Sequence, residues 1–139
     1  MSKLKWVVVF LLCPFALPHI AYGQGRELLK IGKQASVLVE IVEKNGMSTA
    51  TAFCIHPSGV FVTNEHVARH VSKGKTVRLI VDAGLEKERM VEALVVTVDS
   101  KSDLAILKVT SEEVFQTLKL GSNEDSFETM IVTAFGYPF

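Results

Sequence analysis

Residues 60–67 read Val60-Phe61-Val62-Thr63-Asn64-Glu65-His66-Val67. The first four are β-branched or aromatic, which is typical of strands, whereas Asn64 favours turns. The stretch therefore predicts a short strand over 60–63 that breaks into a turn and presents His66 just beyond it. A histidine at a strand end is placed where its ring can reach a cleft.

Other segments with the two-residue period of strands surround this stretch. Ser36–Val42 and Thr49–Ile55 flank Asn45-Gly46, a dipeptide typical of tight hairpin turns. Four more strands are predicted downstream, at Thr76–Val81, Met90–Val98, Leu104–Val109 and Met130–Phe135. Seven short strands without a long helical periodicity predict an all-β barrel or sandwich.

Helix and turn signals are confined to short segments. One or two helical turns are expected over 24–33, and about one turn after His66, over 66–71. A tight turn is expected at Pro57-Ser58-Gly59 because proline and glycine favour turn conformations.

Composition limits the classes of protein to which the chain can belong. It has 139 residues, of which 48% are hydrophobic and 22% charged, as expected for one globular domain. Its 15 basic residues balance its 15 acidic residues, and no long run of Lys or Arg is present. We therefore expect no nucleic-acid partner.

Residues 1–23 have the composition of a secretory signal peptide. Two lysines precede an apolar core over 6–17, and small residues stand at the two positions before Gln24 that a signal peptidase reads. We expect cleavage after Gly23, a mature domain over 24–139, and export to the periplasm or the cell exterior. The apolar core is shorter than the roughly 20 residues of a membrane span, so no stable span is expected after cleavage.

Alternatives to this signal peptide are an uncleaved anchor and a misassigned start. A lipid anchor at Cys13 is disfavoured by the large side chains of Leu11 and Leu12. Cleavage would leave Cys54 as the only cysteine, so no internal disulfide is expected. We interpret Cys54 as a buried small hydrophobic residue, because its apolar neighbours would raise the pKa of a catalytic thiol.

Two residues have positions that suit acyl-transfer chemistry. A serine nucleophile needs an imidazole to take its proton and a carboxylate to hold that imidazole in the useful tautomer. His66 follows one predicted strand, and Asp103 precedes another, which we expect to bury one side of the carboxylate. Taken singly, each residue has a plainer interpretation, as a solvated histidine and a turn-forming aspartate.

The remaining histidines provide weaker candidates. His56 and His70 are interpreted as surface residues, because neither has an acid at a comparable strand end. His66 and His70 are four residues apart and could share a metal on a helix, but the sequence offers no third ligand. We expect no metal and no cofactor.

Four phrases of the sequence resemble those of the Deg/HtrA-type branch of the trypsin-like serine proteases, and they occur in the family's order. They are residues 50–53, 60–67, 99–109 and 134–139. The resemblance implies that His66 is the catalytic base and Asp103 the orienting acid. It also implies the first, six-to-seven-stranded antiparallel barrel of a two-barrel fold, with the second barrel absent from this chain. One small departure is Ala50, where the family usually has glycine.

The nucleophile is the larger departure from the family pattern. In the family it lies in a Gly-Asn-Ser-Gly-Gly phrase on the second barrel, where backbone N–H groups also form the oxyanion hole. No serine of this chain stands in a Gly-x-Ser-Gly context, and the nearest phrase is Gly121-Ser122-Asn123. The acids Glu124 and Asp125 beside it would disfavour an oxyanion.

The resemblance implies the N-terminal part of a secreted or periplasmic serine endopeptidase that acts on unfolded or misfolded polypeptides. Such an enzyme hydrolyses peptide bonds through an acyl-enzyme. As written, the chain is expected to be inactive, because it lacks the nucleophilic serine and the oxyanion hole. The alternative is a non-catalytic single-barrel module that binds exported polypeptides or a separate second half.

Overall fold

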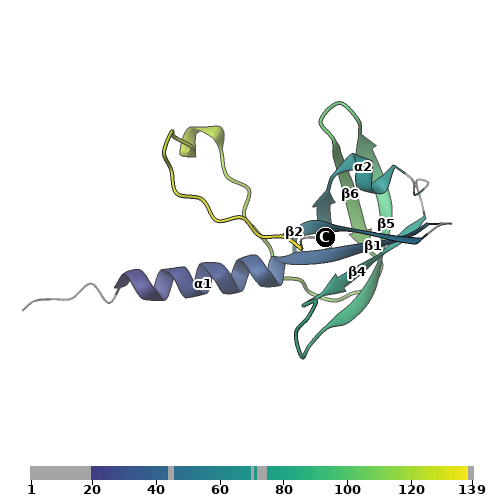
Figure 1. The fold of residues 1–139 in the computed structure, drawn as a ribbon, viewed down its shortest axis with the longest axis horizontal. Helices are drawn as coiled ribbons and strands as arrows, with labels where there is room; N and C mark the ends of the chain where they lie inside the picture. Colours follow the sequence, from purple (N-terminus) through teal and green to yellow (C-terminus); the bar gives the residue numbers. More distant parts are fainter. Residues whose placement is uncertain (1–19, 44–45, 70, 72–74, 138–139) are drawn as a thin grey trace, which may run out of the picture.

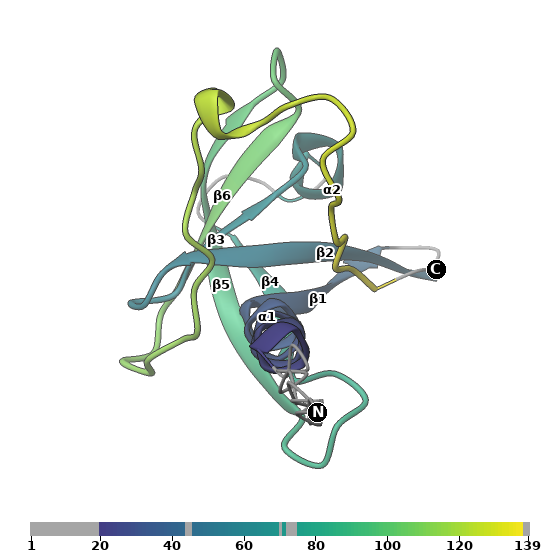
Figure 2. The same cartoon turned by 90° about the vertical axis from the view of Figure 1, so that its left-hand side faces the viewer.

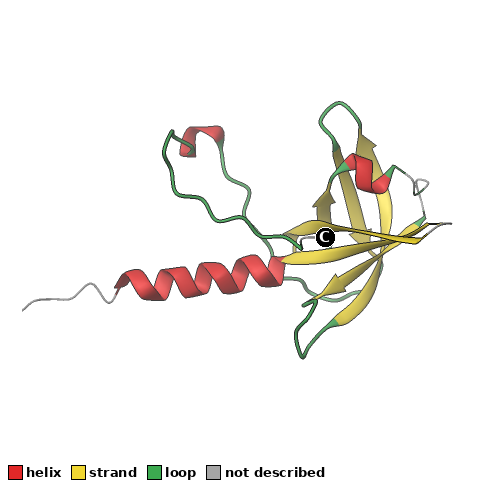
Figure 3. Cartoon of the chain, viewed as in Figure 1, coloured by secondary structure: helices red, strands yellow, loops and turns green. Residues whose placement is uncertain are grey.

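A computed structural model describes residues 20–43, 46–69, 71 and 75–137. Its helices are α1 (Ile20–Ala35), α2 (Glu65–Ala68) and the short 3-10 helix η1 (Asn123–Asp125). Its strands are β1 (Ser36–Glu43), β2 (Gly46–His56), β3 (Val60–Thr63), β4 (Thr76–Val81), β5 (Arg89–Asp99) and β6 (Leu104–Val109). The chain is therefore built mainly of strands, as predicted (Figure 1, Figure 3).

The strands form a closed barrel in the order β1-β2-β3-β6-β5-β4. Every neighbouring pair is antiparallel, including β1 with β4, which closes the barrel. The all-β antiparallel barrel expected from the sequence is confirmed. The predicted hairpin is formed by β1 and β2, although Asn45 lies outside the described residues.

Buried and exposed residues alternate along the strands, and the buried ones fill the interior of the barrel. In β6, for example, Ala105, Leu107 and Val109 are buried while the residues between them are partly exposed. Phe61 of β3 is among the largest fully buried side chains, and its ring meets Phe115 edge-on with centroids 5.3 Å apart. This contact fastens the segment after β6 to the core.

The predicted strand Met130–Phe135 is not a strand in the structure. The barrel closes with β1 to β6, and the apolar side chains of this segment are not buried against it, with Val132 78% exposed. Instead, the chain after β6 runs outside the barrel as an extended loop that carries η1 (Figure 1, Figure 2). Ile131 in this loop is 94% exposed.

Helix α1 is longer than the one or two turns expected. It has 16 residues and runs from Ile20 directly into β1. The predicted cleavage site after Gly23 lies within it, and residues 1–19 of the predicted signal peptide lie outside the described residues. In the part of the chain that the structure describes, no helix is both long and apolar enough to span a membrane.

The loop after η1 returns to α1 and β2. A Cβ atom added at Gly32 would overlap the ring of Phe135, so this ring packs directly on the helix backbone. The backbone N–H of Tyr137 then donates to Oγ1 of Thr51 at 2.9 Å. The end of the described chain is thereby held against the barrel.

Candidate active site

The barrel register brings the end of β3 beside the start of β6. Thr63 and Ala105 are paired residues of these antiparallel strands. His66 follows Thr63 in the short helix α2, and Asp103 precedes Ala105 in the turn after β5. Two segments that are distant in sequence therefore meet at one end of the barrel.

His66 and Asp103 are in direct contact across 37 residues of sequence. Nδ1 of His66 lies 2.8 Å from Oδ2 and 3.0 Å from Oδ1 of Asp103. The backbone N–H of His66 also donates to Oδ1, at 2.9 Å. A carboxylate accepts hydrogen bonds, so this contact favours the tautomer with the proton on Nδ1 and leaves Nε2 as the acceptor nitrogen.

Asp103 has a backbone conformation that is uncommon for a residue other than glycine. Its φ angle is 52°, in the left-handed region that Asp and Asn tolerate better than other residues. The turn that leads into it is held by Asp99, whose Oδ1 accepts from the backbone N–H of Lys101 at 3.0 Å. The turn thus directs Asp103 toward α2.

Asn64 also binds Asp103, a contact that the sequence did not predict. Its Nδ2 atom lies 3.1 Å from Oδ2 of Asp103 and 3.2 Å from the backbone oxygen of the same residue. The carboxylate therefore accepts hydrogen bonds from the backbone and ring of His66 and from the side chain of Asn64.

These hydrogen bonds favour the ionised carboxylate. The backbone N–H of His66, followed by its imidazole and then by Asn64, holds the pKa of Asp103 below its usual value. The side chain of Asp103 is 44% exposed and that of His66 is 56% exposed, so the carboxylate is partly covered while the imidazole stays open to solvent. The inward-facing residues of β6 begin at Ala105, two residues beyond Asp103.

Helix α2 is held by an ion pair next to the histidine. Oε2 of Glu65, whose side chain is largely buried, accepts from Nη2 of Arg69 at 3.1 Å, one helical turn away. The backbone N–H of Arg69 donates to the oxygen of the same Glu65, at 2.7 Å. Sequence reasoning passed over both residues, although the four-residue spacing of opposite charges is a signal for such a pair.

Thr51 joins three of the phrases that carry the family resemblance. Its backbone oxygen accepts from Oγ1 of Thr63 at 2.8 Å, and its own Oγ1 accepts from the N–H of Tyr137 at 2.9 Å. A Cβ added at Gly136 would lie only 3.3 Å from Oγ1 of Thr51, so the approach is close. Strand β3, which ends at Thr63 shortly before the histidine, is thereby linked through Thr51 to the end of the described chain.

The other candidates from the sequence lie in different surroundings. His56 is exposed, and its Nδ1 contacts the hydroxyl of Ser58 at 2.9 Å rather than a carboxylate. His70 lies outside the described residues. Cys54 is buried in β2, as predicted, and this burial raises the pKa of its thiol. Ser122 caps η1, where its hydroxyl accepts from the N–H of Glu124 at 3.2 Å.

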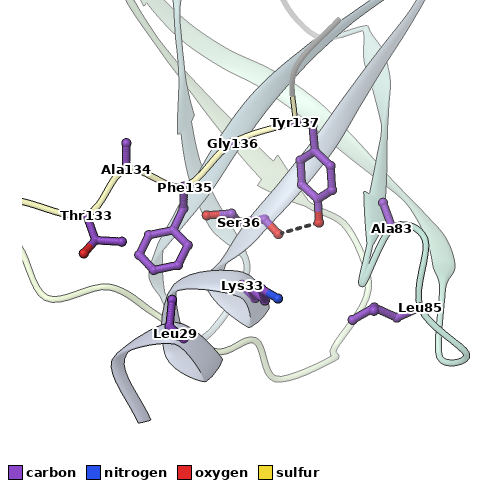
Figure 4. Close-up of a pocket in the computed structure, with 10 residues that line it drawn as sticks. All are labelled: Leu29, Lys33, Ser36, Ala83, Leu85, Thr133, Ala134, Phe135, Gly136 and Tyr137. Atoms are coloured by element: carbon purple, nitrogen blue, oxygen red, sulfur yellow. Dashed lines mark hydrogen bonds between the residues drawn. The ribbon is translucent and has the colours of Figure 1, made fainter. Parts of the chain in front are cut away.

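A cavity of about 370 Å³ lies elsewhere, between α1, the loop after β4 and the segment 133–137. Figure 4 shows Leu29, Phe135 and Tyr137 around it, with the hydroxyl of Tyr137 donating to the backbone oxygen of Ser36 at 3.4 Å. Burial raises the pKa of Tyr137. Neither His66 nor Asp103 lines this cavity. Among the described residues, no three His, Cys, Asp or Glu side chains gather as metal ligands would.

Residues 50–139 match the family of the trypsin-like peptidase domain. The chain belongs to this family. It is 29% identical over 133 residues to "Serine protease HTRA2, mitochondrial" of Bos taurus, and 34% identical over 89 residues to "Probable periplasmic serine endoprotease DegP-like" of Rickettsia conorii. Within the trypsin-like peptidases it is therefore of the Deg/HtrA type, as the resemblance implied.

Coverage shows how much of these relatives the chain represents. The alignments cover 91% and 64% of this chain but only 28% and 16% of the two relatives. In structure, the chain matches the MamO protease domain from Magnetospirillum magneticum with a TM-score of 0.52 and 26% identity, over 66% of this chain and 46% of that one. The chain thus spans about a quarter or less of the two curated relatives, and somewhat under half of this protease domain.

Proposed function

We propose that His66 and Asp103 are the general base and the orienting acid of a serine endopeptidase. The observation that carries this proposal is the 2.8 Å contact between Nδ1 of His66 and Oδ2 of Asp103. In the reaction, Nε2 of His66 takes the proton of a serine hydroxyl and later gives it to the leaving amine. Asp103 holds the ring in the required tautomer and stabilises the imidazolium that forms.

We propose that the nucleophile and the oxyanion hole come from residues outside these 139. Ser122, the best candidate in the sequence, already caps η1 with its hydroxyl. The catalytic pair is open to solvent, and Phe127, Ile131 and Val132 are among the exposed apolar residues of the extended loop. Exposed apolar residues of this kind suit a packing partner. Alone, the chain would be inactive.

The proposed substrates are unfolded or misfolded polypeptides, cleaved outside the cytoplasm. Two Rickettsia relatives carry the name "Probable periplasmic serine endoprotease DegP-like". This name agrees with the signal peptide that the sequence predicts over 1–23, which remains a prediction. Export of the chain would place the catalytic pair in the compartment that the name of these relatives specifies.

The test is hydrolysis of fluorescently labelled, unfolded casein. The 139-residue chain is assayed alone and joined to the second barrel of a Deg/HtrA-type protease that carries the Gly-Asn-Ser-Gly-Gly phrase. We expect no hydrolysis by the chain alone and hydrolysis by the joined protein. His66→Ala should abolish this activity, whereas His56→Ala, which alters an exposed histidine without a carboxylate partner, should preserve it. Full activity of the His66→Ala variant would contradict the proposal.

Closure of the barrel favours a second candidate function. The six strands close on one another and surround a core of their own. Such a unit could act as a non-catalytic module that binds exported polypeptides or a separate second half. For this candidate we expect residues 24–139 to unfold cooperatively and to bind unfolded casein without cleaving it, equally well in the His66→Ala variant.

A further inference from the structure

We propose that Asn64 is a positioning residue of this site, whose side-chain amide fixes the carboxylate of Asp103 toward the imidazole of His66. The inference rests on the proposed function, because the pair that Asn64 positions is the proposed catalytic pair. Asn64 acts through Asp103, because its side chain bonds to the carboxylate and the backbone oxygen of that residue rather than to the histidine ring.

The direction of the hydrogen bonds determines which end of the Asn64 side chain faces Asp103. Both atoms within reach, Oδ2 at 3.1 Å and the backbone oxygen at 3.2 Å, are acceptors. Only the amide nitrogen of an asparagine can donate, so the nitrogen must face them. One side chain thus binds both the carboxylate and the backbone of the same residue.

The position of Asn64 in the fold offers it another partner, which it does not use. It is the N-cap residue of α2, where an asparagine commonly accepts a hydrogen bond from a backbone N–H of the first helical turn. Its side chain makes no such bond in this structure. The side chain is therefore committed to Asp103 rather than to the helix.

The backbone of Asp103 explains why a second attachment matters. Its φ angle of 52° is uncommon for a non-glycine residue, and its carbonyl oxygen accepts from Asn64 in this conformation. The carboxylate is partly exposed, so water can compete for its oxygens. Without Asn64, the carboxylate would keep only its hydrogen bonds with His66 and would be freer to turn away from the ring.

Two variants of Asn64 separate a donor role from a space-filling role. Asn64→Ala removes the amide. Asn64→Asp keeps the shape but places a second carboxylate against Oδ2 of Asp103, so like charges repel. The matched control is Asn123→Ala, which removes an exposed asparagine in η1. All are made in the 139-residue chain, and circular dichroism checks that each is folded.

The readouts are the proton resonance of His66 Nδ1 and the carboxyl titration of Asp103, both measured by NMR. We expect the Nδ1 proton signal of the unaltered chain and of Asn123→Ala to be strongly downfield and protected from exchange. In Asn64→Ala the signal should broaden or vanish and the pKa of Asp103 should rise, and both effects should be larger in Asn64→Asp.

An unchanged Nδ1 signal in both Asn64 variants would overturn the inference. So would an Asn64→Asp chain with the same Nδ1 signal and the same Asp103 pKa as the unaltered chain. Absence of the signal from the unaltered chain would overturn it as well, because there would be no oriented pair to position. Failure of the proposed function would give a different result. The joined protein would still hydrolyse casein with the His66→Ala change, while the NMR results of the Asn64 variants would be as expected.

Discussion

Asp103 is bound to His66 through the peptide as well as through the ring. Oδ1 of Asp103 accepts from the backbone N–H of His66 at 2.9 Å, while Nδ1 of the ring lies 2.8 Å from Oδ2. The two bonds attach each carboxylate oxygen to the same residue. Rotation of the ring away from Asp103 would therefore leave the carboxylate attached to α2.

Replacement of the Asp103 carboxylate by an amide should preserve the shape of the site but change the tautomer of the His66 ring. Asp103→Asn keeps the size of the side chain and suits the left-handed backbone, which asparagine also tolerates. An amide nitrogen facing Nδ1 would favour the wrong tautomer, so kcat of the joined protein should fall by roughly 10⁴-fold, with KM little changed. Steady-state hydrolysis of casein checks this, and a fall of less than tenfold would argue against an orienting role.

Low pH should weaken the attachment between Asp103 and α2. The pKa of Asp103 is depressed, chiefly by the backbone N–H of His66, so its ionised form contributes stability above the unfolded-state pKa of about 3.9. That contribution is lost as pH falls through the lower pKa of the folded state.

The comparison that isolates this contribution is urea unfolding of the unaltered chain and of Asp103→Asn between pH 7 and pH 2. The unaltered chain should be the more stable at pH 7, and the difference should disappear toward pH 2. A difference that stayed constant, or grew as the pH fell, would contradict the assignment.

Truncation of Phe61 should destabilise the core of the barrel. This ring is fully buried and packs edge-on against Phe115, so Phe61→Ala should lower the free energy of unfolding by about 3–5 kcal/mol. Phe127→Ala is the matched control, because that side chain is 70% exposed and its loss should change stability by no more than about 0.5 kcal/mol. Equal effects of the two changes in urea unfolding would contradict the described core.

The contact between Gly32 and Phe135 should hold the segment 133–137 against helix α1. Gly32→Ala improves helix propensity by up to about 1 kcal/mol, but the new methyl group would occupy the position of the Phe135 ring. We expect a more stable helix and a displaced segment 133–137.

Limited proteolysis measures this displacement. Cleavage within 126–137 should be faster in Gly32→Ala than in the unaltered chain, and Phe135→Ala, which removes the ring without filling its space, should show how fast a released segment is cut. Protection equal to that of the unaltered chain would show that the ring does not rest on Gly32.

Local sequence patterns predicted the barrel strands well. Val60–Thr63, Thr76–Val81 and Leu104–Val109 have the predicted boundaries, because each combines β-branched residues with flanking turn residues. The same propensity wrongly predicted a strand over 130–135. A strand is stabilised by burial of its apolar side chains, and in this segment Ile131 and Val132 are exposed while β1 to β6 close the barrel without it.

The candidate site was only partly predictable. His66 and Asp103 stood out by residue type, strand-end position and family phrase, and the β3–β6 register places them together. Asn64 did not stand out as a site residue, because an asparagine after a strand usually indicates a turn. Its partner, Asp103, lies 39 residues away in the sequence. For Asp103 the sequence predicted a carboxylate covered on one side, and its side chain is 44% exposed in the structure.

The central claim is that Asp103 prepares His66 to act as a base through Nε2. The most direct measurement is the tautomer of the neutral His66 ring in the 139-residue chain, obtained from the one-bond nitrogen–proton couplings of its two ring nitrogens. We predict a proton on Nδ1 and none on Nε2, and loss of this preference in Asp103→Ala. A neutral ring that carries its proton on Nε2 in the unaltered chain would contradict the account.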